Sequence, residues 1–151
     1  MGAPKPLVEF KLKWFDHSSL YTENQSEILS LALLSLGINA EPAREVFWVL
    51  LAGHKKGLSL SVKQIRDLIY EKRKKNGETD LESGLTVRNI QVWLSYFQQI
   101  GLVECLGDKY IFRGGKKPSQ AFEQYTKPLI EKNTQYIIET FVRLEELYEI
   151  R

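Results

Sequence analysis

The stretch from Thr86 to Arg113 constrains the fold more than any other part of this chain, because its apolar spacing changes abruptly at a glycine. Before Gly101 the apolar residues recur at intervals of three and four, the spacing of a helix that buries one face. These residues are Ile90, Leu94 and Phe97. Thr86 is placed to cap the start of the helix and Gly101 to end it. After the glycine, the dipeptide at 107–108 (Gly-Asp) separates two short apolar runs, which predicts a tight hairpin.

Two more helices and a short strand are expected between residues 41 and 75. Pro42 stands where a helix can begin, and the apolar residues after it form one face that ends near Gly53. The apolar run 58–60 can pair as a small strand. Ser61 and Gln64 form a capping box, which predicts a second helix running toward Lys75. The polar stretch 76–84 has glycine near both ends and no apolar period, so it is expected to be an exposed loop.

The amino-terminal part is expected to contain one strand and one helix. Between Val8 and Trp14 apolar and charged residues alternate, the two-residue period of a half-buried strand. Thr22 and Gln25 are spaced as a capping box, which predicts a helix that runs to Gly37. Because this helix is apolar nearly all round, we expect it to be buried or to lie in a subunit interface.

The carboxy-terminal part is expected to be a helix, with a restart at Pro128 that Thr126 would cap. Its apolar residues recur at about seven-residue intervals and form a stripe that needs a partner. The stripe can pack on the chain's own core, but a terminal helix after a small domain more often meets a second copy, so we predict a homodimer, with Asn133 and Thr140 helping to set its register. The expected dimer residues are Ile130, Ile137, Phe141, Leu144, Leu147 and Tyr148.

The element order over residues 43–113 is helix, short strand, helix, loop, helix and hairpin. The segment Thr86–Val103 resembles the third helix of winged helix-turn-helix transcription regulators, in which a leucine-rich helix ends in Gly-Leu-Ile/Val and enters the wing. Leu102 and Val103 match the first wing strand, and residues 110–112 match the second. The resemblance implies a mainly α fold with a small β-hairpin wing. It also implies three segments: an amino-terminal extension (1–40), the winged domain (41–115) and a carboxy-terminal dimerisation helix (116–151).

The face of the third helix opposite its apolar side carries polar residues and almost no carboxylate. Arginine can bond guanine, asparagine and glutamine can bond adenine, and valine can contact the thymine methyl group, so this face suits reading of the major groove. A neutral surface for protein contact is the alternative interpretation. The expected base-reading residues are Arg88, Asn89, Gln91, Val92 and Ser95.

Basic residues concentrate in the middle of the chain. The formal net charge is only +2. Residues 55–117, however, carry 13 basic and 7 acidic side chains, and both flanks are mildly acidic. A solvated loop would give the same count, but in a winged domain these side chains would lie near DNA phosphates. The expected backbone contacts are Lys63, Arg66, Lys72, Arg73, Lys74, Lys75, Tyr96, Lys109, Arg113, Lys116 and Lys117.

The sequence offers little for catalysis or cofactor binding. Cys105 is the only cysteine, which excludes a disulfide framework and a four-cysteine zinc site. His17 and His54 have no metal-ligand partner at a suitable spacing, and His54 is expected to be an exposed turn residue. There is no glycine-rich phosphate loop or serine elbow. We therefore expect no enzyme activity, no metal and no cofactor. A small-molecule effector is possible but unsupported, since the aromatic residues that could line a pocket for it are more often core residues.

The sequence thus predicts a DNA-binding transcription regulator that acts as a dimer on double-stranded DNA. No apolar run approaches the length of a membrane span, and no signal pattern opens the chain, so a soluble cytoplasmic protein is expected. A winged domain that binds another protein within a replication, transcription or RNA-processing assembly is the alternative, and RNA binding is a third interpretation.

Overall fold

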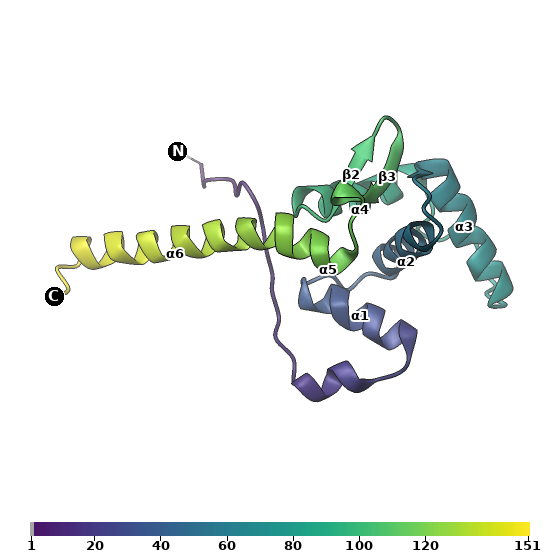
Figure 1. Ribbon diagram of the computed structural model, residues 1–151. Coiled ribbons are helices and arrows are strands. Elements are labelled where there is room, and N and C mark those ends of the chain that lie inside the picture. The colour runs from purple at the N-terminus through teal and green to yellow at the C-terminus, as the bar shows by residue number, and fades with distance from the viewer. Residues whose placement is uncertain (1) are drawn as a thin grey trace.

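Three helices and a small sheet form the body of the molecule in the computed structural model, which describes residues 2–151. The helices are α2 (Glu41–Lys55), α3 (Val62–Lys75) and α4 (Val87–Gln99), and each packs on the other two. The strands are β1 (Leu60–Ser61), β2 (Val103–Leu106) and β3 (Lys109–Phe112), which form an antiparallel sheet in the order β1-β3-β2. Figure 1 shows the sheet lying against one end of the helices. The predicted helices and hairpin of residues 41–113 are therefore present.

The core lies where the three helices meet the sheet. Ile90, Leu94 and Phe97 of α4 are buried, as their spacing predicts, together with Ile65 and Ile69 of α3. An aromatic cluster joins the helices to the sheet, because the ring of Phe47 on α2 lies 5.5 Å from that of Phe97 and 5.3 Å from that of Phe112. Burial of these large rings stabilises the contact of α4 with α2 and β3.

Local sequence signals set the boundaries of α3 and α4. Ser61 and Gln64 form both hydrogen bonds of the predicted capping box, at 3.2 and 2.8 Å. The Thr86 side chain accepts a hydrogen bond from the Asn89 backbone at 3.1 Å and caps α4 as predicted. The strand predicted at 58–60 is shifted, to Leu60–Ser61. The basic run at residues 72–75 forms the last turn of α3.

The amino-terminal prediction is partly wrong, since residues 8–14 form no strand. They run as an extended segment with no neighbouring strand, so the alternating pattern has no ladder to join. Its Trp14 side chain is 92% exposed. The segment is held instead by the backbone N–H of Lys13, which donates to Ser35 at 2.9 Å. A short 3₁₀ helix, η1 (His17–Tyr21), follows it.

The first long helix, α1 (Gln25–Ser35), begins later than predicted. Asn24 is its cap and accepts from the Glu27 backbone at 3.1 Å, while the Thr22 hydroxyl donates to the Glu27 carboxylate at 2.7 Å. Asn24 competes successfully because asparagine is a stronger cap than threonine. Of the two expected settings for this helix, full burial does not hold, because Leu33 is its only buried residue and the other leucines are half-buried; a subunit interface stays a prediction.

The carboxy-terminal part is one long helical arm. It comprises α5 (Pro118–Ala121), the π-helical turn η3 (Phe122–Thr126) and α6 (Lys127–Leu147). Thr126 is not a cap: its backbone is helical, its side chain is fully buried, and it makes no capping hydrogen bond. The helix continues through Pro128 because proline is tolerated in the first turn. Figure 1 shows α6 projecting away from the body.

The arm joins the body at the end of α4. Gly101 has φ +86°, and a Cβ there would lie 2.9 Å from the Tyr125 carbonyl oxygen. Only glycine allows both this backbone conformation and this close approach. Within residues 2–151, no helix has the length and apolarity that crossing a membrane requires.

Candidate nucleic-acid interface

One face of α4 is open to solvent and carries no acidic side chain. Helix α4 contains no aspartate or glutamate, and Val92 on the outward face is 54% exposed. At 100° per residue, this face lies opposite the buried side of the helix. The exposed polar side chains on it are Arg88, Ser95 and Gln99, with Gln91 and Gln98 at its edge. Four of the five predicted base-reading residues, Arg88, Gln91, Val92 and Ser95, therefore lie together on one accessible surface.

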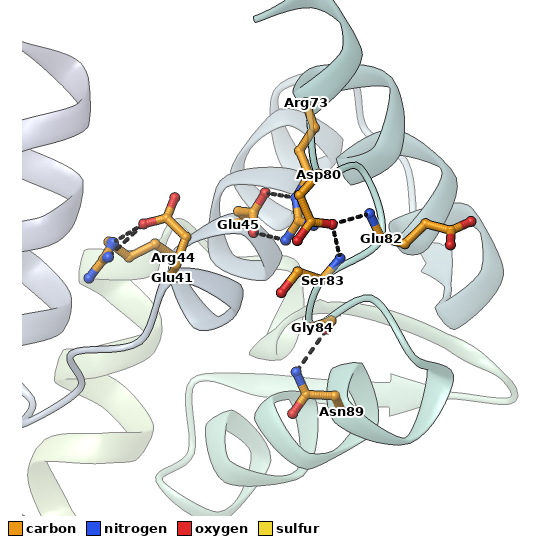
Figure 2. Close-up of polar contacts among 9 residues, drawn as sticks. All are labelled: Glu41, Arg44, Glu45, Arg73, Asp80, Glu82, Ser83, Gly84 and Asn89. Atoms are coloured by element: carbon orange, nitrogen blue, oxygen red, sulfur yellow. Dashed lines mark hydrogen bonds and ion pairs between the residues drawn. The ribbon is translucent and has the colours of Figure 1, made fainter. Parts of the chain in front are cut away.

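The fifth predicted base-reading residue, Asn89, is engaged within the protein. Its side-chain N–H donates to the Gly84 carbonyl at 2.8 Å, which ties the start of α4 to the preceding loop. Figure 2 shows this contact beneath the loop. The side-chain amide of Asn89 therefore positions α4 and does not point outward with Arg88 and Gln91.

Tyr96 also lies on the flank of α4 that faces the protein. It is half-buried, and its ring is 6.4 Å from those of Trp93 and Phe97. Burial raises the pKa of Tyr96, and the negative charge of Glu9 raises it further. Tyr96 lines a hollow with Glu9 and Lys11 of the amino-terminal segment, so it is unsuited to the phosphate contact expected from the sequence.

Arg73 is not available for DNA, because it is buried against α2. Its Nε donates to Oε2 of Glu45 at 2.7 Å, and its Nη2 donates to Oε1 at 2.6 Å. Only 5% of either side chain is exposed. These hydrogen bonds raise the pKa of Arg73, against an opposing effect of burial, and the charges of Glu45, Glu78 and Asp80 add to the increase. The assignment of Arg73 as a phosphate contact is therefore wrong, since a buried and paired guanidinium cannot reach a ligand.

The loop between α3 and α4 is held in one conformation by contacts next to this ion pair (Figure 2). The Asp80 carboxylate accepts from the backbone N–H groups of Glu82 and Ser83 at 3.2 and 3.0 Å. Gly84 has φ +72°, and a Cβ there would lie 2.8 Å from the Pro42 ring. Leu85 is buried. These contacts fix the point at which the chain enters α4, so they set the direction of the exposed face.

The remaining basic residues of α3 lie on two different flanks. Lys72 stacks over the Trp48 ring, with Nζ 4.4 Å from the ring centroid. Lys72 and Lys75 line a groove of about 450 Å³ between α2 and α3, together with Trp48 and Leu68. The helical period places Lys63, Arg66 and Lys74 on the opposite flank of α3, where all three are exposed. These three cations, together with Asp67 on the same flank, lie away from the groove and are open to solvent.

The predicted phosphate contacts after the hairpin are also spread over different places. Lys109 is exposed in β3, next to the turn at Gly107, where φ is +68°. The Arg113 guanidinium stacks over the Tyr125 ring at 4.4 Å, so it joins the hairpin to the helical arm. Lys116 is half-buried, and the Lys117 backbone donates to the Gln120 side chain at 3.2 Å as α5 begins. Lys109 is the one of these four residues that lies on the hairpin itself.

No group of three metal-ligating residues is found among residues 2–151. Cys105 is half-buried in β2, and its Sγ donates to the Gly107 carbonyl at 3.2 Å, so it packs within the hairpin. His54 is not the exposed turn residue expected from the sequence. It belongs to α2, and its ring lies 5.9 Å from that of Phe112.

Sequence reasoning missed Glu45 and Trp48, the two α2 residues that decide which basic residues are available. A glutamate on the apolar face of α2, among Ala43, Val46 and Val49, is a signal for a buried charge that needs a partner. That signal identifies Glu45 as unusual, but it does not select Arg73 over the lysines beside it.

Comparisons with protein-family models, with curated proteins and with solved structures found no match to this chain. The function of this chain is therefore inferred from the geometry of α4 and the residues around it.

Proposed function

We propose that this protein binds double-stranded DNA as a winged helix-turn-helix regulator, with the exposed face of α4 in the major groove. The observation that carries the proposal is the open, carboxylate-free surface of α4; α3 and the hairpin supply the exposed cations Lys63, Arg66, Lys74 and Lys109. A helix that simply faced water would more often carry glutamate and lysine. The strand order β1-β3-β2 behind the three helices is in keeping with a winged domain.

Each exposed side chain of α4 has a role that its chemistry allows. The Arg88 guanidinium can bond the O6 and N7 atoms of guanine, the Gln91 amide can bond adenine, and Val92 can contact a thymine methyl group. Lys63, Arg66, Lys74 and Lys109 would contact phosphates, which gives affinity that depends on salt but carries no sequence information. Asn89, Arg73 and Lys72 are left out of this interface because each is engaged within the protein.

The proposal includes a homodimer formed through the apolar stripe of α6. Two copies would present two α4 helices to one DNA duplex, which predicts a partly palindromic site with half-sites about 34 Å apart. Support comes from the stripe itself, since Ile137, Phe141, Leu144, Leu147 and Tyr148 are all at least 45% exposed in the single chain.

Selection of bound sequences from a random duplex pool tests the proposal. We expect an enriched motif whose binding weakens steeply as salt concentration rises. In the Arg88→Ala, Gln91→Ala double variant, removal of each base-reading side chain should weaken binding to the motif by about 1–3 kcal/mol, while the affinity for unrelated duplexes changes little. If the wild-type chain enriches no motif and shows no salt-dependent binding, the proposal fails. Competition with structured RNA distinguishes DNA binding from RNA binding.

A protein-interaction module is the second candidate, and the groove between α2 and α3 favours it. The groove is lined by the exposed Leu58 and Leu68 side chains and by Lys56, Lys72 and Lys75, which outnumber its one carboxylate, Glu71. Such a surface suits an apolar segment that also carries carboxylates. Variants of Leu68 would then abolish binding of a protein partner, whereas variants of Arg88 would not.

A further inference from the structure

The apolar side of α6 is exposed along most of the helix. No residue of α6 is buried, and Phe141 and Tyr148 are 58% and 73% exposed. The helix has 21 residues, which corresponds to a length of about 31 Å. Because it projects away from the body (Figure 1), nothing in the described part of the chain covers its second half.

We propose that α6 pairs with the α6 of a second copy in the antiparallel orientation, as a two-stranded coiled coil. The inference rests on the homodimer of the proposed function and adds the geometry of that dimer. The seam follows intervals of four and three residues, which is the heptad spacing of a coiled coil. The seam residues are Ile130, Thr134, Ile137, Phe141, Leu144 and Tyr148.

The sizes of the seam residues favour the antiparallel orientation. A parallel pair would place Thr134, Phe141 and Tyr148 each against its own counterpart, at positions where parallel dimers prefer β-branched aliphatic residues. In the antiparallel pair, Ile137 packs against Phe141 of the second copy, and Thr134 packs against Leu144. Every layer then combines an aliphatic residue with a threonine or an aromatic residue, so each layer pairs a smaller side chain with a larger one.

The distribution of charge favours the same orientation. From residue 139 to the end of the chain, Glu139, Glu145, Glu146 and Glu149 outnumber Arg143 and Arg151, which leaves a net charge of −2. From 127 to 138, Lys127 and Lys132 outnumber Glu131, which leaves +1. A parallel pair would bring the two acidic halves together. An antiparallel pair brings each acidic half beside a basic one.

The orientation also determines where the two bodies lie. Ile130 and Tyr148 are 18 residues apart, or about 27 Å along the helix. An antiparallel pair therefore holds the two bodies at opposite ends of a short rod. This separation is of the same order as the half-site spacing of about 34 Å that two recognition helices require. A parallel pair would crowd both bodies at one end.

Disulfide trapping tests the orientation in the full chain, with Cys105→Ser as the background. One preparation carries Thr134→Cys and the other carries Leu144→Cys, both on the exposed side of the helix, so neither change affects the core. In the antiparallel pair, residue 134 of one copy faces residue 144 of the other, whereas identical positions lie about 15 Å apart, too far for a disulfide. We expect a cross-linked dimer after oxidation of the mixture and almost none from either preparation alone.

The other outcomes overturn the inference in different ways. Efficient cross-linking of the Leu144→Cys preparation by itself would show a parallel pair, in which case the homodimer stands and the orientation is wrong. A monomeric mass by analytical ultracentrifugation, with no cross-linking in any preparation, would overturn both the pairing and the homodimer. Because neither measurement uses DNA, a loss of DNA binding alone would leave the pairing intact.

Discussion

Glu45 of α2 and Arg73 of α3 form a buried, doubly hydrogen-bonded ion pair, with N···O distances of 2.7 and 2.6 Å. The pair joins the two helices next to the loop that leads into α4. It takes the guanidinium from a run of four basic residues into the core and leaves the neighbouring lysines at the surface. This contact therefore supports the loop that enters α4 and removes one of the four cations from the surface.

The ion pair predicts a large loss of stability when one partner is removed. Glu45→Gln leaves the buried Arg73 charge uncompensated, and we expect the free energy of unfolding to fall by about 3–5 kcal/mol. Glu41→Gln is the matched control, because Glu41 is 67% exposed and its 2.6 Å pair with Arg44 should contribute at most about 1 kcal/mol. Guanidinium denaturation measures both. Equal losses in the two variants would contradict the structural role of Glu45.

Substitutions of Asn89 and Gln91 are predicted to have different effects, because Asn89 positions α4 and Gln91 is expected to contact a DNA base. Asn89→Ala removes the hydrogen bond to Gly84, so we expect a loss of stability of about 0.5–1.5 kcal/mol. Gln91→Ala changes an exposed side chain, so stability should stay the same while the preference among DNA sequences weakens. Thermal unfolding measures the stability of both variants, and binding to the selected motif measures their sequence preference. A reversed pattern would show that Asn89, and not Gln91, faces the bases.

Lys74 and Lys72 are predicted to contribute differently to DNA affinity, although they lie two residues apart in the chain. Lys74→Ala should weaken binding to all duplexes and reduce the slope of log affinity against log salt by about 1. Lys72→Ala should leave that slope unchanged, because its ammonium lies over Trp48 in the groove between α2 and α3. It should instead alter the fluorescence of Trp48. A similar change of slope in both variants would place the groove in the DNA interface.

Substitution of two glycines by alanine is predicted to destabilise the protein to different extents, by backbone strain alone at Gly107 and by strain plus a steric clash at Gly101. Gly107→Ala introduces a side chain at φ +68° where no heavy atom lies within 4 Å, so we expect a loss of about 1–2 kcal/mol from the backbone alone. Gly101→Ala adds to this a contact of 2.9 Å with the Tyr125 carbonyl oxygen, so its loss should be clearly greater. Chemical denaturation compares them. Equal losses would mean that the helical arm does not pack tightly on the end of α4.

Tyr96 is predicted to ionise at higher pH than an ordinary tyrosine. Burial is the main cause, and because it favours the neutral phenol, the folded-state pKa lies above the ordinary value of 10.0. The corresponding stability is fully present below the unfolded pKa and is lost as the pH rises through the folded pKa. A titration of phenolate absorbance should show a late-ionising group that Tyr96→Phe removes. An unchanged late transition in that variant would assign it elsewhere, for example to Tyr110, whose pKa is also raised by burial.

Local signals are sufficient for the central elements of this protein. The capping groups Ser61 and Thr86, the period of Ile90, Leu94 and Phe97, and the turn at Gly107 each act within a few residues, so the helices and hairpin of residues 41–113 can be predicted from the sequence. The alternation at 8–14 is misleading for a different reason. A strand requires a partner strand, and the sequence of one segment does not say whether a partner is near.

The sequence by itself determined that α4 has an outward face without carboxylates, because a helical period alone decides which residues share a face. Only the tertiary structure decided which of the candidate site residues reach that surface. Arg73, Lys72 and Asn89 look as available as Lys74 and Gln91 in the sequence, but contacts with Glu45, Trp48 and Gly84 engage them. The partners of Arg73 and Lys72 lie on another helix, and which side chains meet across two helices depends on how the helices pack. Gly84 lies only five residues before Asn89, but its carbonyl is placed by the folded loop.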